Sequence, residues 1–266
     1  MIKSVSTFHK LSVCDGLEAL ATRNYNTAFP FHFHQTYNIS LVYDGIFRTK
    51  VGEKTLHAPS GAILITNPLE VHSNPVEINE RISYFTFYVS ADFFNFSTSS
   101  QPVFFHNNVI YDELLFNRLR QVAILIENGG ADDSIEQELS SALQSLASKY
   151  AFADGKNELV TNHSMFKDLL ANENLDKFSL DQTAKQFGIN KYKFLRLFKF
   201  QTGLTPNNYF ILKRIEKSKE LLSAGDDLLS IAVDLGFYDI PHFAKHFKKF
   251  TGISPAAYSS AITSAE

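Results

Sequence analysis

Cysteine is almost missing from this sequence of 266 residues: Cys14 stands alone, so no disulfide can form within the chain. We expect its thiol to be a small buried core residue. The sequence also lacks an apolar stretch long enough to span a bilayer, and its first sixteen residues contain no apolar segment typical of a signal peptide. From these absences we expect a cytoplasmic protein without a membrane partner.

The whole chain has no large excess of one charge sign, because its net charge is −3. The net charge of its N-terminal part nevertheless differs from that of its C-terminal part. Residues 179–266 hold 12 Lys and Arg against 8 Asp and Glu, a balance of +4. The whole chain has 25 Lys and Arg and 28 Asp and Glu, so the first 178 residues hold 13 basic and 20 acidic residues, a balance of −7. The length predicts two domains with separate cores. The charge difference predicts that only the C-terminal domain contacts phosphate groups.

A helical unit occurs twice in the basic part of the chain. In the second copy, Asp227 can cap a first helix, Gly236 allows a tight turn, and Pro241 suits the start of a second helix. Two short helices joined in this way are typical of a helix-turn-helix unit. A shift of 49 residues pairs the second copy with identical residues of the first, at Phe194, Phe198, Lys199, Thr202, Gly203, Pro206 and Tyr209.

The second helix of each unit is expected to have one buried and one basic face. Phenylalanines at helical spacing define the buried face in both copies. The opposite face carries Tyr192, Arg196 and Lys199 in the first copy and Pro241, Lys245 and Lys248 in the second, with His242 on its flank. The shift of 49 residues maps the first set onto the second. These residues therefore predict a DNA-binding surface, with a merely solvated basic face as the alternative.

One uninterrupted helix is expected between the two copies, from Thr205 to Gly225. Thr205 can cap it, Pro206 suits its first position, and Gly225 can end it. Roughly twenty residues at about 1.5 Å each give a length of about 30 Å. This length is close to one turn of DNA, about 34 Å, so both basic helices could enter successive major grooves.

Residues 166–261 closely resemble the tandem helix-turn-helix DNA-binding domain of the AraC/XylS family of transcription regulators. The sequence FKKFTGISP at 247–255, followed by Tyr258, matches the family signature without a gap. The resemblance implies that Tyr192, Leu195 and Arg196 read bases in the first unit. It implies the same role for Pro241, His242 and Lys245 in the second. Pro241 departs from the pattern because proline cannot donate a hydrogen bond to a base edge.

The N-terminal part has the pattern of a sheet-rich domain. Short strands are predicted at residues 37–43, 46–51, 55–58, 62–66 and 81–89, with turns at Asp44-Gly45 and Gly52-Glu53. Their spacing predicts a β-sandwich or small barrel. Helices are expected at residues 112–127 and 134–152, and they either carry dimer contacts or only pack on the barrel. The predicted linker, residues 153–157, separates domains at 1–153 and 158–266, and residues 165–171 would begin the second domain as a helix.

Two fragments of this part resemble the two motifs of the cupin barrel. The first is His32-Phe33-His34 with Asn38 and Gly45, and the second is Pro59-x-Gly61 with Pro68 and His72. Their position before a tandem helix-turn-helix resembles the sensory domain of AraC-type regulators. In one strand, His32, His34 and Asn38 would share the inward face. Metal-binding cupins carry a glutamate where this chain has Asn38, a poorer ligand.

Three uses of the N-terminal domain remain open from the sequence. The favoured one is a site for an organic effector formed by His32, His34, Asn38, His72 and Tyr84. The others are a zinc or iron ion held by the three histidines, and a filled barrel that serves only for dimerisation.

We predict a two-domain protein, with a cupin-like β-barrel and flanking helices before an all-α tandem helix-turn-helix. Its function would be sequence-specific transcription regulation, activation by resemblance, with no catalytic residues, cofactor or metal. Double-stranded DNA and a small-molecule effector are the expected partners, with RNA polymerase and a second copy of the chain as further candidates. The alternative is a metal-dependent cupin enzyme or metal sensor with an appended DNA-binding module, against which Asn38 argues.

Overall fold

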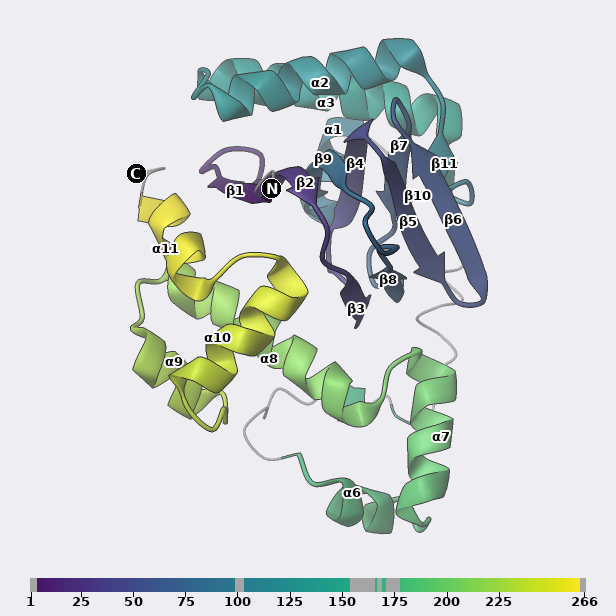
Figure 1. Ribbon diagram of the computed structural model, residues 1–266, viewed down its shortest axis with the longest axis vertical. Helices are drawn as coiled ribbons and strands as arrows, with labels where there is room; N and C mark the ends of the chain where they lie inside the picture. Colours follow the sequence, from purple (N-terminus) through teal and green to yellow (C-terminus); the bar gives the residue numbers. More distant parts are fainter. Residues whose placement is uncertain (1–3, 99–102, 154–165, 167–168, 171–177, 264–266) are drawn as a thin grey trace. The chain divides into compact units, whose positions relative to one another are not determined.

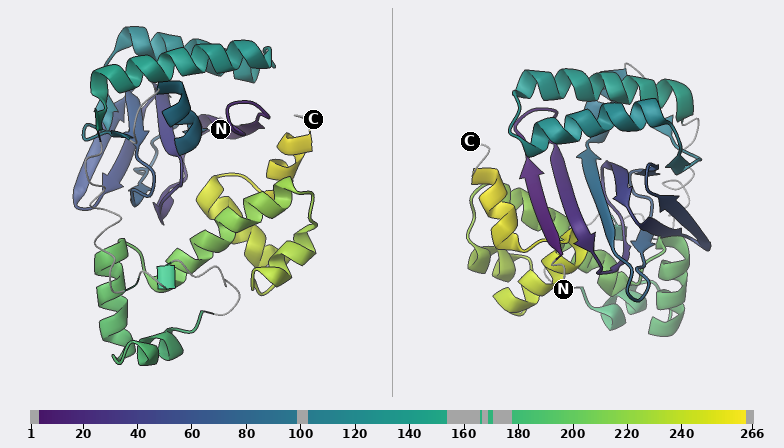
Figure 2. Two further views of the ribbon diagram at one scale, coloured as in Figure 1. Left: turned by 180° about the vertical axis from the view of Figure 1, so that it is seen from behind. Right: turned by 45° about the horizontal axis from the view of Figure 1, so that its top comes forward.

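The computed structural model describes residues 4–98, 103–153, 166, 169–170 and 178–263. Among these, residues 4–28, 33–153 and 261–263 form one compact unit, and residues 29–32, 166, 169–170 and 178–260 form another (Figures 1 and 2). Residues 29–32 are hydrogen-bonded within an N-terminal sheet and are described with it. The predicted linker falls almost entirely on residues 154–157, outside the described residues, so the domain boundaries stay a prediction.

Strands dominate the N-terminal part, as predicted. The described strands are β1 (Val5–Lys10), β2 (Glu18–Tyr25), β3 (Phe29–His32), β4 (Tyr37–Asp44), β5 (Ile46–Val51), β6 (Lys54–Pro59), β7 (Ile63–Thr66), β8 (His72–Asn74), β9 (Ile82–Val89), β10 (Val103–Phe104), β11 (Val109–Ile110) and β12 (Phe152–Ala153). They form a six-stranded sheet in the order β1-β2-β9-β4-β7-β11, a four-stranded sheet in the order β3-β8-β5-β6, and the pair β10-β12. The described strands therefore pair in separate sheets, and their hydrogen bonds do not close into one continuous barrel.

Helices cover one face of the six-stranded sheet (Figure 2). They are α1 (Ala91–Thr98), α2 (Glu113–Glu127) and α3 (Asp132–Tyr150). Tyr37, Ile39 and Leu41 of β4 are buried in one core with residues of these helices. Because side chains alternate along a strand, Asn38 and Ser40 lie on the opposite, inner face. The helices thus cover an apolar face and leave a more polar face within the sheets.

The single cysteine lies in this same core, as predicted. Burial, followed by the charges of Glu136 and Asp132, raises the pKa of Cys14 to about 12. The thiol is therefore protonated at neutral pH and is not a nucleophile.

Two hairpin glycines provide a matched test of the N-terminal fold. Gly45 and Gly52 both have positive φ, +79° and +57°, which costs about 1–2 kcal/mol for any other residue. A Cβ at Gly45 would also overlap the carbonyl oxygen of Arg81, whereas one at Gly52 would meet nothing within 4 Å. In denaturant unfolding, Gly45→Ala should therefore lower the free energy of unfolding by about 1–3 kcal/mol more than Gly52→Ala does. Equal decreases in the free energy of unfolding would show that Gly45, in the β4–β5 turn, does not contact the backbone of Arg81.

Six described helices follow in the C-terminal part of the chain: α6 (Leu180–Gln186), α7 (Lys191–Thr202), α8 (Pro206–Ser223), α9 (Leu228–Asp234), α10 (Ile240–Thr251) and α11 (Pro255–Thr263). The caps predicted at Asp227 and Thr205 begin two of these helices. Asp227 accepts hydrogen bonds from the N–H groups of Leu229 and Ser230, and Thr205 accepts one from Asn208. The long helix predicted between Thr205 and Gly225 is confirmed as α8.

The two helical units repeat in detail. Phe198 and Tyr209 pack edge to face with ring centroids 5.5 Å apart, and Phe247 and Tyr258 do the same at 5.5 Å. Gly203 and Gly252 end α7 and α10 in the left-handed conformation, with φ of 73° and 83°. The shift of 49 residues therefore relates equivalent structural positions.

Basic side chains of helix α8 bond to the chain before α6 and to the turn after α9. The Lys213 ammonium donates to the carbonyl oxygen of Leu170 at 2.8 Å, and the Arg214 guanidinium donates to that of Gly236 at 3.1 Å. Of the helix predicted at residues 165–171, the structure describes only Phe166, which is buried against α7, and residues 169–170. Within the described residues, none of the helices has the length and apolar character needed to cross a membrane.

Candidate nucleic-acid interface and histidine cluster

Helix α7 presents the predicted basic face to solvent. The Asn190 side chain begins it by accepting from the N–H of Lys193 at 2.9 Å. Phe194 and Phe198 are buried, which turns the opposite side outward. Of the predicted DNA-contacting residues, Tyr192, Arg196 and Lys199 are exposed and Leu195 is half-buried. The helix contains no acidic residue, so all its charged side chains are basic.

Helix α10 presents the equivalent face. Asp239 caps it by accepting from the N–H of His242 at 2.6 Å. Pro241, Lys245 and Lys248 are exposed, opposite the buried Phe243 and Phe247, and α10 likewise contains no acidic residue. Sequence pattern alone therefore placed both basic faces on the outside of the unit.

His242 differs from the other predicted base-reading residues. It is half-buried, and its Nδ1 accepts from the N–H of Tyr238 at 3.3 Å. Its Nε2 lies 3.1 Å from Nε2 of His246, a residue that the sequence did not single out. Burial, followed by the charges of His242, Lys249 and Lys245, lowers the pKa of His246. Both ring nitrogens of His242 thus have partners within the protein, the N–H of Tyr238 and the ring of His246.

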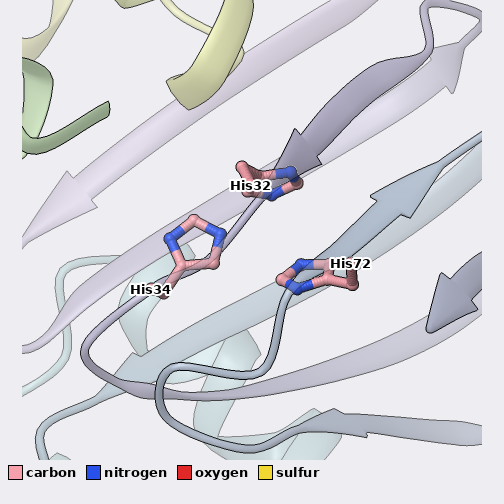
Figure 3. A group of neighbouring side chains, drawn as sticks. All are labelled: His32, His34 and His72. Atoms are coloured by element: carbon pink, nitrogen blue, oxygen red, sulfur yellow. The ribbon is translucent and has the colours of Figure 1, made fainter. Parts of the chain in front are cut away.

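Three buried histidines meet in the N-terminal part (Figure 3). His32 ends β3 and His72 begins β8, the neighbouring strand, whereas His34 lies in the connection to β4. One ring nitrogen from each lies within 4.8 Å of those of the other two. The expectation that His32, His34 and Asn38 share one strand is wrong, because β3 ends at His32. The chain bend after β3 brings His34 to the cluster instead.

Hydrogen bonds define the protonation of two of these rings. Nδ1 of His32 lies 2.7 Å from the carbonyl oxygen of Pro30, and Nδ1 of His72 lies 2.8 Å from that of Glu70. A carbonyl oxygen only accepts, so both Nδ1 atoms carry a proton, and in a neutral ring Nε2 then keeps the lone pair. Burial, opposed by the bond to Glu70, lowers the pKa of His72 to about 4. This imidazole is therefore neutral at pH 7.

Asn38 and Tyr84 make contacts with residues other than the three histidines. The Asn38 side-chain oxygen accepts from the Thr36 hydroxyl at 2.9 Å. The Tyr84 ring packs against Phe47 with centroids 4.5 Å apart. The aromatic ring beside His34 is Tyr88, with centroids 5.4 Å apart. Tyr88 is the register partner of Asn38, which only the strand pairing could reveal.

A separate cavity of about 430 Å³ opens between β4 and α2. An ion pair borders it, with Arg23 and Glu127 3.0 Å apart, and the Arg23 guanidinium lies 5.4 Å from the centre of the Tyr43 ring. None of the residues predicted to bind an effector lines it. The lining residues are Arg23, Val42, Tyr43, Ser60, Gly61, Phe116, Arg120, Ile124 and Glu127.

Solved structures share this fold. ToxT from Vibrio cholerae O395 matches with a TM-score of 0.53 over 98% of both chains, at 15% identity. Wild-type ToxT from Vibrio cholerae strain SCE256 with a bound unsaturated fatty acid matches with a TM-score of 0.52 over 99% of both chains, at 14% identity. At these identities the likeness shows a common two-domain fold.

Sequence comparisons assign both domains. Residues 16–146 match the AraC-like ligand binding domain, and residues 183–261 match a helix-turn-helix domain. An uncharacterized HTH-type transcriptional regulator of Bacillus subtilis (strain 168), YbfI, is 26% identical over 85% of both chains. The HTH-type transcriptional activator AarP of Providencia stuartii is 31% identical over 36% of this chain and 78% of its own. The chain therefore belongs to the AraC family of transcriptional regulators, with a ligand-binding domain before its helix-turn-helix domain.

Proposed function

We propose that this regulator binds specific DNA sequences under the control of a small molecule held by its N-terminal domain. The observation that carries the proposal is the burial of polar side chains on the inner faces of the sheets. His32, His72 and Asn74 are each less than 9% exposed, on strands that an apolar core could have filled. Burying a polar group costs free energy that its hydrogen bonds only offset, so a domain needed only for packing gains nothing from accumulating such groups.

The inner face is polar along several strands. The hydroxyls of Ser40 and Thr86 lie 2.7 Å apart across the β4–β9 pair. In the four-stranded sheet, the Asn74 amide donates to the Thr49 hydroxyl at 2.9 Å. Together with His32, His34, Asn38, His72 and Tyr84, these groups support an effector site. The fatty-acid-bound ToxT supports the same use of this fold.

DNA recognition would use α7 and α10. The exposed residues Tyr192, Arg196 and Lys199 would contact one major groove, and Pro241, Lys245 and Lys248 the next. Leu195 would offer an apolar contact, and His242 would hold the start of α10. Helix α8, with 18 residues and a length of about 27 Å, is the spacer between the two. An effector would act by favouring the conformation in which both helices can reach DNA.

The remaining features of the regulator are also part of the proposal. Activation is supported by the likeness to AarP, a transcriptional activator. A homodimer, contact with RNA polymerase and a cytoplasmic location fit this activity. So does the absence of catalysis, since the relatives are named as transcriptional regulators.

Salt dependence tests the DNA-binding part of the proposal. Lys199 and Lys248 are equivalent, exposed and placed at the ends of the basic faces. Each phosphate contact adds about −0.9 to the slope of log K against log salt. Lys199→Ala and Lys248→Ala should therefore each reduce this slope by about 0.9 in binding assays with the full chain. Lys54→Ala, an exposed lysine of β6, is the control. Unchanged slopes for both variants would contradict phosphate contact by these helices.

A further inference from the structure

We propose that His32, His34 and His72 form a binding site for a divalent transition-metal ion of the zinc class. Three imidazoles from two neighbouring strands and one connection converge, as Figure 3 shows. Imidazole nitrogen is a preferred ligand of zinc, copper, iron and nickel. The site lies in the proposed effector region, but metal binding does not depend on the proposed function.

The spacing of the nitrogens is close to that of a formed site. Zinc–nitrogen bonds of about 2.0–2.1 Å place neighbouring ligands of a tetrahedral ion about 3.4 Å apart. The three candidate nitrogens lie within 4.8 Å of one another. Ring rotations that move each nitrogen by about 1 Å would therefore close the site around an ion.

Hydrogen bonds already orient two of the ligands. Nδ1 of His32 donates to the carbonyl of Pro30, and Nδ1 of His72 donates to that of Glu70. Metal-ligating histidines typically donate their second ring nitrogen to a carbonyl or carboxylate, which fixes the tautomer and the ring. In both rings Nε2 is therefore the nitrogen that can bind a cation.

The acidic side chain of Glu70, two residues before His72, does not complete the site. The Glu70 carboxylate accepts hydrogen bonds from the N–H of Asn67, from its side-chain amide and from the amide of Asn108. Asn38 is neutral and accepts from Thr36. Three neutral ligands leave both positive charges of the ion uncompensated. An open coordination position would therefore favour an anionic group, such as the carboxylate of a small organic ligand.

Metal titration of the chelator-treated full chain tests the site. Calorimetry with Zn²⁺ should show one bound ion per chain, and Co²⁺ should give the visible absorption of a tetrahedral or five-coordinate ion. His34→Ala and His72→Ala should each lower the affinity at least about 100-fold, because each removes a direct ligand. His57→Ala is the matched control, since His57 is exposed on β6 of the same sheet. It should bind both ions as the unchanged chain does.

Thermal unfolding separates loss of a ligand from loss of the fold. Saturating Zn²⁺ should raise the Tm of the unchanged chain and of His57→Ala, but not that of folded His34→Ala. His34 lies in a connection and not in a strand, so its replacement is the milder change. Failure of saturable Zn²⁺ and Co²⁺ binding, or equal binding by His34→Ala and His72→Ala, would overturn the metal site. DNA binding by the metal-free chain, measured in parallel, would leave the proposed function standing in that case.

Discussion

Replacing Arg196 with alanine is expected to weaken DNA binding by about 1–3 kcal/mol, or roughly 5- to 150-fold, and to relax base preference at one half of the binding site. Arg196 is exposed on α7, opposite the buried Phe194 and Phe198. Its planar guanidinium can bond O6 and N7 of guanine together. Base-substitution scans with the full chain would measure both effects.

The repeat supplies the control for this prediction. Lys245 of α10 is equivalent to Arg196, but lysine offers a flexible point charge in place of a planar fork. Pro241 cannot donate, and both ring nitrogens of His242 are engaged with Tyr238 and His246. Lys245→Ala should therefore weaken binding with less loss of discrimination. Equal losses on every DNA variant after Arg196→Ala would mean that Arg196 holds phosphate and does not read sequence.

The largest effect on stability is expected from Phe198→Ala, which should cost about 3–5 kcal/mol. Phe198 is fully buried, with ring centroids 5.2 Å from Phe166 and 5.5 Å from Tyr209. Alanine would leave a cavity between α7 and α8 that the surrounding rings cannot fill. Because a domain is stable by only about 5–15 kcal/mol, α7 should lose much of its order and specific DNA binding should fall.

Phe200→Ala is the matched variant two residues away on the same helix. Phe200 is 87% exposed, so its removal should change stability by less than about 0.5 kcal/mol. Denaturant unfolding followed by circular dichroism would compare the two variants. Similar decreases in the free energy of unfolding for both variants would contradict the assignment of Phe198 to the core.

The C-terminal unit was predictable because its signals are local. Asp227, Thr205 and Pro206 mark helix starts through caps and a fixed φ, and glycines mark helix ends. Phenylalanines at helical spacing then select the buried face. None of these signals needs knowledge of distant contacts, so both helix-turn-helix units and α8 were found from the sequence.

The N-terminal domain was predictable only where hairpins are local. The strands from Tyr37 to Thr66 follow turn signals, but β1 and β2 were not predicted. The β2 sequence EALATRNY is rich in residues without strand preference, and it is a strand because β1 and β9 flank it. Likewise, Tyr88 adjoins His34 through the β4–β9 register, which the sequence does not specify.

Selection of bound duplexes from a random DNA library by the full chain tests the central claim most directly. Two helix-turn-helix units joined by α8 predict an enriched motif with two short conserved segments whose centres are about 10 bp apart. In duplexes selected by Arg196→Ala, sequence conservation should then fall in one segment and remain in the other. A library that shows no enrichment, or one segment only, would contradict recognition of DNA by both basic helices.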